Sequence, residues 1–293
     1  MIKKLLSNLP SRKGITGINR RNLDLIYPNN ARIFFPNVDD KIKCKELLGS
    51  AGLPLLETYF VADSHKSIND WEKNLDGVDR FVIKPNKSYG GLGIIIVKRT
   101  DDGYFDSDRF YTAEDISFHL KMIYGGAFSL DNTSDIAYFE QMAENDKLLN
   151  QFIPEGFRTI TDIRLIFQNE KPVMGMLRAP TKKSKGKANL HQGGIGIGID
   201  IQTGITRNGC MKNDLIDKHP DTGMKLAGVQ VPGFEKMIEV GSRISQLVGL
   251  GYIGIDFVAD NNLGPVILEV NARPGLNIQL ANQYGIGKRL NEI

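Results

Sequence analysis

Three residues near the end of the chain, Asp256, Glu269 and Asn271, carry oxygen atoms that could bind one metal ion together. They lie in two runs rich in Ile, Val and Leu that flank an Asp-Asn-Asn-Leu-Gly segment, a pattern that predicts a β-hairpin with a loop of about four residues. If Asp260 pairs with Pro265, Asp256 stands opposite Glu269, and Asn271 shares that face. Opposed carboxylates repel unless a cation lies between them, and these oxygens suit Mg²⁺ bound with substrate phosphates. A surface hairpin whose acidic residues face water is the alternative.

A second stretch that could do chemistry joins Lys84 to a glycine-rich loop. Lys84 ends the apolar run RFVIK, and Gly90, Gly91 and Gly93 follow it. Backbone N–H groups of such a loop can close over phosphates, and a lysine at its base adds a compact positive charge. No Gly-Lys-Ser/Thr opens a helix here, and the loop leads into the strand-like run IIIVKR, so neither a Walker loop nor a Rossmann fingerprint is present. A simple turn between two strands is the other interpretation.

Two arginines interrupt apolar runs. Arg164 lies in DIRLIF and Arg178 in PVMGMLRA. An inward-facing arginine is costly unless it finds an anionic partner, so each could face a charged substrate. An outward-facing, solvated arginine is the alternative in both cases.

A lysine cluster follows the second of these runs, made of Lys182, Lys183, Lys185 and Lys187. It could hold an acidic acceptor, or it could be a solvated, mobile loop. His191 lies nearby, but a lone histidine is more often structural, so we assign it no proton transfer. Trp71, the only tryptophan, is expected in a core or an interface.

The composition is that of an ordinary globular protein. Of the 293 residues, 41% are hydrophobic and 24% are charged. A net charge of +3 gives no argument for nucleic-acid binding, but it fits an anionic small ligand. Cys44 and Cys210 lack metal-ligand spacing, no apolar run approaches the roughly 18 residues that span a bilayer, and the start is too weakly apolar for a secretory signal. We therefore expect a cytoplasmic protein with free thiols.

The elements that position these residues can be predicted from periodicity and breakers. Residues 1–36, with Arg12 among several arginines, predict a short basic arm, and a helix is expected from Asp39 until Gly52 and Pro54. Residues 80–98 predict strand, loop and strand. Thr112 and Asp115 predict a capped helix that ends at Gly125. The acidic segment 125–147 is interpreted as a long loop.

The second half of the chain is expected to consist mostly of strands. These are LLNQFI (148–153), ITDIRLIF (160–167), PVMGMLRA (172–179) and IGIGIDI (195–201), and a helix is expected from Pro232 to Gly249. Strands that meet through hairpins, with helices at intervals, predict an α+β fold with antiparallel sheets.

In this order the segments resemble the ATP-grasp superfamily. The resemblance rests on Asp40-Lys41 opening a helix that ends AGLP, VIKP with the glycine loop, LNQFI, DIRL, NLHQGG, and GIDF with LEVNARPG. Within the superfamily, the chain is most similar to the ribosomal-protein glutamate ligases and to the alpha-L-glutamate ligase-like proteins. The likeness runs from about Asp39 to Leu280, and it implies two subdomains with antiparallel sheets that grip ATP.

The resemblance also implies a domain order. Residues 1–75 would form a short arm and helical segment, residues 76–153 a lid subdomain with the Gly-rich loop, and residues 154–293 a C-terminal subdomain with the metal hairpin. ATP-grasp enzymes usually carry a full N-terminal α/β domain, which we expect to be truncated here. The arm, the insertion at 100–147 or a partner, which could be a second copy of the chain, would then complete the acceptor pocket.

The resemblance implies roles for individual residues. The nucleotide site would use Lys41, Lys84, Ser88, Gly90, Gly91 and Gly93 at the phosphates, Gln151, Phe152 and Ile153 at the adenine, and Glu155 at the ribose. Gln151 departs from the acidic residue that is usual there. Asp256, Glu269 and Asn271 would bind two Mg²⁺ ions, with Mn²⁺ able to substitute. Arg164 and Arg178 would be catalytic and substrate-binding, and Asn189 and Arg273 would also bind substrate.

The activity that this implies is an ATP-dependent carboxylate–amine ligase that forms an amide or peptide bond through an acylphosphate. The amine would be glutamate or another amino acid, added to a peptide or protein. Two alternatives stay open: a ligase that acts on a carrier- or sugar-linked carboxylate with a different amine, and a regulatory ATP-binding module without turnover. No nucleic acid is expected among the partners.

Overall fold

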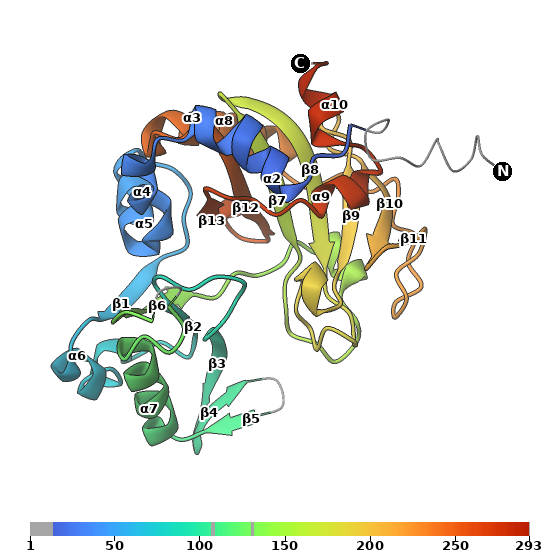
Figure 1. Cartoon of the computed structure of the whole chain (residues 1–293). Helices are drawn as coiled ribbons and strands as arrows, with labels where there is room; N and C mark the ends of the chain where they lie inside the picture. The colour runs from blue at the N-terminus through green and yellow to red at the C-terminus, as the bar shows by residue number, and fades with distance from the viewer. Residues whose placement is uncertain (1–13, 107–108, 130–131, 293) are drawn as a thin grey trace. The chain divides into compact units, whose positions relative to one another are not determined.

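The computed structural model describes residues 14–106, 109–129 and 132–292 (Figure 1). The chain forms two compact units: unit 1 consists of Met1–Val38, Leu47–Pro54 and Glu144–Ile293, and unit 2 of Asp39–Glu46 and Leu55–Ala143. The domain boundaries expected after residues 75 and 153 stay a prediction. The expected helix that begins the resemblance is confirmed as α4 (Pro36–Asp39) followed by α5 (Lys41–Ser50). No helix in the described ranges is long and apolar enough to cross a membrane.

Unit 2 is built on a six-stranded antiparallel sheet with the order β1-β6-β2-β3-β4-β5. The strands are β1 (Thr58–Ala62), β2 (Arg80–Pro85), β3 (Ile95–Thr100), β4 (Gly103–Asp106), β5 (Arg109–Tyr111) and β6 (Ala137–Gln141), accompanied by α6 (His65–Asn69), η4 (Lys73–Leu75) and α7 (Ala113–Tyr124). The predicted pair of strands around the glycine loop is confirmed as β2 and β3. The predicted cap of α7 is also confirmed, since the Thr112 hydroxyl accepts from Asp115 N at 3.1 Å.

Strand β6 shows that the interpretation of residues 125–147 as a loop was wrong for residues 137–141, whereas the described residues on both sides of them lack helix and strand. It lies between β1 and β2, and Phe139 is fully buried there. The Phe139 ring stacks on Trp71 with centroids 5.8 Å apart, and the Trp71 indole N–H donates to Ser117 Oγ at 3.0 Å, so the core assignment of Trp71 is confirmed. A strand buried on both faces lacks the alternation that marks a strand in sequence, which explains the error.

Unit 1 is built on a seven-stranded antiparallel sheet with the order β11-β10-β9-β8-β7-β12-β13. The strands are β7 (Asp162–Gln168), β8 (Lys171–Ala179), β9 (Ile195–Ile199), β10 (Thr206–Met211), β11 (Asp214–Ile216), β12 (Tyr252–Asp260) and β13 (Gly264–Asn271), and the helices include α8 (Phe234–Val248), α9 (Ile278–Asn282) and α10 (Ile286–Leu290). The predicted helix α8 packs closely, because a Cβ at Gly241 would come within 2.3 Å of the Phe167 ring. The expected α+β fold with antiparallel sheets is confirmed.

Two predictions in unit 1 had different outcomes. The run LLNQFI is not a strand, because Leu149–Phe152 form the 3-10 turn η5. The hairpin β12–β13 is confirmed with Asp256 opposite Glu269, although Asp260 pairs with Gly264 rather than with Pro265. A β-bulge after Asp256 compensates for this shift of one residue.

The N-terminal arm contains more structure than expected. Its described part forms the short turns α2 (Ile18–Arg20), η2 (Arg21–Ile26), α3 (Tyr27–Asn29) and η3 (Arg32–Phe34). The buried Asn30 side chain donates to Tyr252 O and accepts from Tyr252 N, both at 2.8 Å, so it continues the hydrogen bonding of β12. The first 13 residues of the arm, with Arg12, lie outside the described residues.

Candidate functional site

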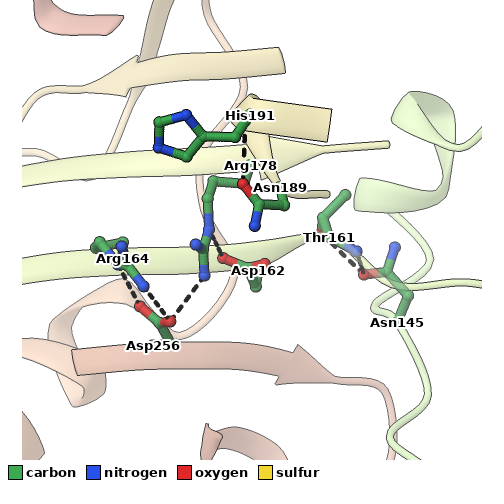
Figure 2. Close-up of polar contacts among 8 residues, drawn as sticks. All are labelled: Asn145, Thr161, Asp162, Arg164, Arg178, Asn189, His191 and Asp256. Atoms are coloured by element: carbon green, nitrogen blue, oxygen red, sulfur yellow. Dashed lines mark hydrogen bonds and ion pairs between the residues drawn. The ribbon is translucent and has the colours of Figure 1, made fainter. Parts of the chain in front are cut away.

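Arg164 and Arg178 converge on one carboxylate on the sheet of unit 1 (Figure 2). Arg164 Nε and Nη2 donate to the two Asp256 oxygens, both at 2.6 Å, and Arg178 Nη2 donates to Asp256 Oδ2 at 2.8 Å. Arg178 Nε donates to Asp162. The ladder produces this contact set, because Asp256 pairs with Arg164 and Asp162 pairs with Arg178 in register. Both arginines therefore face inward and have anionic partners.

Burial and charge act in opposite directions on this arginine–aspartate cluster. Burial alone would raise the pKa of Asp256, but the charges and hydrogen bonds of Arg164 and Arg178 outweigh it and lower the pKa to about 2. Burial raises the pKa of Asp162 to about 6; Arg178 opposes this shift, and the nearby Asp256 charge adds to it. Burial would lower the pKa of Arg178, but Asp162 and Asp256 raise it instead. Asp256 and Arg178 are therefore held in their charged forms.

The hairpin face also carries the other two predicted metal ligands. Glu269 lies opposite Asp256, and Asn271 follows it at an interval of two residues. Asn271 Nδ2 is buried and has no hydrogen-bond partner among the described residues. Rotation of the Asn271 side-chain amide by half a turn would place its oxygen at this position.

This donor set fits a hard cation. In the described residues no three His, Cys, Asp or Glu side chains group as a metal site, so the Asn271 oxygen is needed for a third donor. Arg164 and Arg178 are balanced by Asp256 and Asp162, and Glu269 adds a further carboxylate to this face. Carboxylate and amide oxygens are the hard ligands that Mg²⁺ prefers.

In unit 2, Lys84 belongs to a buried cluster with Lys45 and Glu140. Each lysine forms an ion pair with one oxygen of Glu140, whose side chain is only 3% exposed. Burial lowers the pKa of Lys45, and Glu140 opposes this shift. Two ammonium groups around one carboxylate leave a charge of +1 in a partly desolvated place, which favours an anion.

Lys41 begins helix α5, and its side chain reaches the start of the glycine loop. Its ammonium group donates to Asn86 O at 3.2 Å and to Ser88 O. The Asn86 side chain accepts from Ile42 N at 2.8 Å, and the buried Asp135 accepts from Lys87 N at 2.9 Å. The first residues of the loop are therefore fixed to α5 and to Asp135.

The three glycines of the loop have positive φ angles, as a tight loop over a ligand requires: Gly90 +63°, Gly91 +78° and Gly93 +74°. Nothing lies within 4 Å of a Cβ built at Gly90 or Gly91, whereas a Cβ at Gly93 would come within 2.7 Å of Phe128 and Pro85. Gly93 O also lies 2.8 Å from His119 Nε2. The loop is thus open at its tip and held at its far end.

The residues predicted at the adenine and the ribose do not join these groups within unit 2. Gln151 and Phe152 lie in η5 of unit 1, where Gln151 Nε2 donates to Leu148 O at 2.7 Å and Phe152 is fully buried. Ile153 follows the turn, and Glu155 is exposed. In unit 2, β2 lies between β3 and β6, and β6 ends with Glu140 and Gln141. The adenine and ribose roles stay predictions.

The predicted substrate residues Asn189 and Arg273 have local partners. The Asn189 side chain accepts from His191 N at 3.0 Å and caps the 3-10 turn η6 (Leu190–Gln192) (Figure 2). Asn189 therefore has a structural role in this loop. The Arg273 guanidinium lies 4.3 Å from the centre of the Phe35 ring. Their substrate roles also stay predictions.

Sequence reasoning missed Lys45, Glu140 and Asp162. Lys45 follows Lys41 by four residues on the same helix, and Asp162 alternates with Arg164 along β7, so both spacings carried a signal. Glu140 carried no such signal, because its strand was not recognised.

A pocket of about 230 Å³ lies elsewhere in unit 1. It is lined by Val173 and Met174 at the start of β8 rather than by Arg178 near the end of that strand.

Comparisons with known proteins agree with this architecture. A family model described as "Sugar-transfer associated ATP-grasp" matches residues 20–293. A "Probable alpha-L-glutamate ligase" from Hydrogenovibrio crunogenus (strain DSM 25203 / XCL-2) is 24% identical over 266 residues, 90% of this chain and 66% of the relative. The chain spans 61% to 66% of the length of such curated relatives.

Two solved structures share the fold. D-alanine–D-alanine ligase from Bacillus anthracis complexed with ATP has a TM-score of 0.52 at 14% identity, over 96% of this chain and 73% of that one. Biotin carboxylase from Campylobacter jejuni complexed with β-γ-ATP has a TM-score of 0.54 at 14% identity, over 88% and 46%. The expected ATP-grasp, glutamate ligase-like identity is confirmed. Since the family model covers nearly the whole chain, the protein belongs to the sugar-transfer associated ATP-grasp family.

Proposed function

We propose that the chain is an ATP-dependent ligase that joins a carboxylate to an amine. The observation that carries the proposal is the convergence of Arg164 and Arg178 on Asp256, on the sheet face that also bears Glu269 and Asn271. A cationic pair beside a cation-binding face suits a reaction in which an anionic acid meets a metal-bound phosphate. Family membership and the ATP bound by the D-alanine–D-alanine ligase relative support the nucleotide.

The phosphate end of ATP would lie against the lysines and the glycine loop. Lys84, with its buried partner Glu140, and Lys41 at the loop base supply positive charge. Loop residues Ser88 to Gly93 present backbone N–H groups and allow close approach, because the glycines carry no Cβ. Exclusion of water by this loop would protect a reactive intermediate from hydrolysis.

Asp256, Glu269 and Asn271 would hold Mg²⁺, which when bound offsets the charge of the phosphate oxygens. Two ions, and Mn²⁺ as a substitute, belong to this proposal. Arg178 and Arg164 would orient the substrate carboxylate. This carboxylate attacks the γ-phosphorus, and ADP leaves. The amine then attacks the acylphosphate carbonyl, Arg178 stabilises the developing oxyanion, and phosphate leaves as the amide forms.

Two substrate classes are favoured by different observations. The curated relatives are named probable alpha-L-glutamate ligases, which supports glutamate as one of the two substrates, and with it the class in which glutamate is added to a peptide or protein. The family description mentions sugar transfer, which favours the second class, a sugar-linked acid joined to a different amine. Product masses separate the two.

The proposal is tested by measuring ADP release with panels of acids and amines. We expect release that requires both substrates, and Asp256→Ala and Glu269→Ala should each lower it at least about 100-fold, because each removes a metal ligand. Glu235→Ala, an exposed carboxylate on α8, is the matched control and should behave like wild type. Wild-type rates in both hairpin variants would overturn the mechanism. Nucleotide binding without turnover for any substrate pair would indicate a regulatory module.

A further inference from the structure

Five lysines gather on unit 1 and form what we call the lysine platform. Lys182, Lys183, Lys185 and Lys187 lie between β8 and β9, Lys212 lies in the turn between β10 and β11, and all five are exposed. Contact with Lys212 and repulsion by its charge lower the pKa of Lys183, so these two side chains lie close together. Within the described ranges, none of the five has a carboxylate at ion-pair distance. Positive charge is thus concentrated in these five side chains, and the Asp221 carboxylate beside them accepts from the Lys182 backbone N–H rather than from a lysine ammonium group.

The backbone beneath the lysines is held in place. Thr181 and Ser184 are buried, and each hydroxyl accepts from the backbone N–H of the other at 2.9 Å. The Thr181 hydroxyl also donates to Gly193 O at 2.9 Å, which joins the start of the segment to its end. Of the two interpretations that the sequence left open, the solvated mobile loop is therefore the weaker.

Neighbouring segments brace the platform from outside. His219 is 1% exposed, and its Nε2 lies 2.9 Å from Pro180 O. The Asp221 carboxylate accepts from Lys182 N at 2.8 Å, and the Thr159 hydroxyl donates to Gly186 O at 2.7 Å. A segment whose backbone is already fixed loses less entropy when its side chains bind a partner than a flexible loop does.

The platform continues the strand that carries Arg178. Lys182 follows Arg178 by four residues, so their Cα atoms lie within about 14 Å, a distance that an extended peptide of about four residues can span. The platform contains lysines and no arginine. Lysine is a flexible point charge, whereas planar, bidentate recognition of phosphate favours arginine, so the composition favours a chain of separate carboxylates.

Resting on the proposed function, we propose that the lysine platform binds an acidic peptide as the acid substrate and presents one of its carboxylates to Arg178. The probe is a fluorescent hexaglutamate peptide, and its binding is followed by anisotropy without nucleotide. The variant K183Q/K185Q/K187Q should bind it about ten-fold or more weakly, with a smaller salt dependence. The control K66Q/K98Q/K121Q removes the same charge from exposed lysines of unit 2 and should bind like wild type.

If both variants bind the peptide equally more weakly than wild type, the platform proposal is wrong, because the effect then comes from net charge alone. Equal or tighter binding of an acidic oligosaccharide or of single-stranded DNA of the same charge would overturn the peptide assignment. If the triple variant fails to fold by circular dichroism, Lys212→Gln alone must weaken peptide binding, and an unchanged affinity counts against the proposal. Peptide binding without ADP release for any substrate pair would remove the ligase function and retain the platform. ADP release by a protein that does not bind the peptide would remove the platform and retain the ligase function.

Discussion

At the scale of single residues, Asp256 connects the two arginines of unit 1, because its carboxylate accepts hydrogen bonds from both of them. In Asp256→Asn, Arg164 and Arg178 would lose a charged partner in a place where their side chains are each 14% exposed. We expect the free energy of unfolding to fall by about 3 kcal/mol in urea denaturation, since breaking a buried ion pair leaves an uncompensated charge. Glu269→Gln, on the same face but only half-buried, should change it by about 0.5 kcal/mol or less while it lowers activity. Equal losses in both variants would contradict this separation.

Asp162 should add an unusual pH dependence of stability. Its pKa of about 6 in the folded protein lies above its ordinary value of 3.8, so its stabilising contribution is present below pH 4 and is lost as pH rises through 6. The wild-type free energy of unfolding should therefore fall relative to that of Asp162→Asn over this range, by on the order of 3 kcal/mol. Denaturant titrations at several pH values measure the difference. Parallel pH curves for the two proteins would mean that Asp162 stays charged.

At the scale of elements, the glycine loop is held at Gly93 and open at Gly91. Gly93→Ala combines a positive φ with a Cβ that meets Phe128 and Pro85, whereas Gly91→Ala carries the φ strain alone. We expect Gly91→Ala to cost about 1 kcal/mol and Gly93→Ala about 2 to 4 kcal/mol, with the larger rise in KM for ATP also at Gly93. Unfolding titrations and initial rates with a competent substrate pair check the two effects. Comparable costs at both glycines would argue against a fixed end at Gly93.

Two elements show where sequence patterns fail. LLNQFI has the composition of a strand, but Leu149–Phe152 turn as η5 and bury Phe152. AYFEQ lies in an acidic segment, and yet it is the interior strand β6, between β1 and β2, and it supplies both Phe139 and Glu140. Short segments take their structure from tertiary partners, which local propensity does not include.

At the scale of the whole molecule, each unit has its own core, so we expect two unfolding transitions. The single tryptophan lies in the core of unit 2, and Phe139 packs on it, whereas Phe167 is buried in unit 1. Phe139→Ala should destabilise the transition seen by tryptophan fluorescence by about 3 to 5 kcal/mol. Phe167→Ala should leave that transition in place and destabilise one seen by circular dichroism. If both variants shift both signals equally, the two units unfold together.

The sequence by itself determined the features that depend on neighbours along the chain. The hairpin β12–β13 and the shared face of Glu269 and Asn271 could be predicted, because a short turn joins the strands and a strand face repeats every two residues. The cap of α7 and the strands on both sides of the glycine loop were predictable for the same reason. Asp256 stands opposite Glu269 as predicted, but only because the bulge after Asp256 offsets a pairing that begins at Gly264.

Only the tertiary structure decided which residues meet across the sheets. Glu140 reaches Lys84 from 56 residues away because β6 inserts between β1 and β2, and Arg178 reaches Asp256 from 78 residues away because β7 lies between their strands. Strand order is set by the packing of the whole sheet, and side-chain spacing within one strand contains no record of it. The sequence therefore identified the residues capable of chemistry, and the fold selected the partners that hold them.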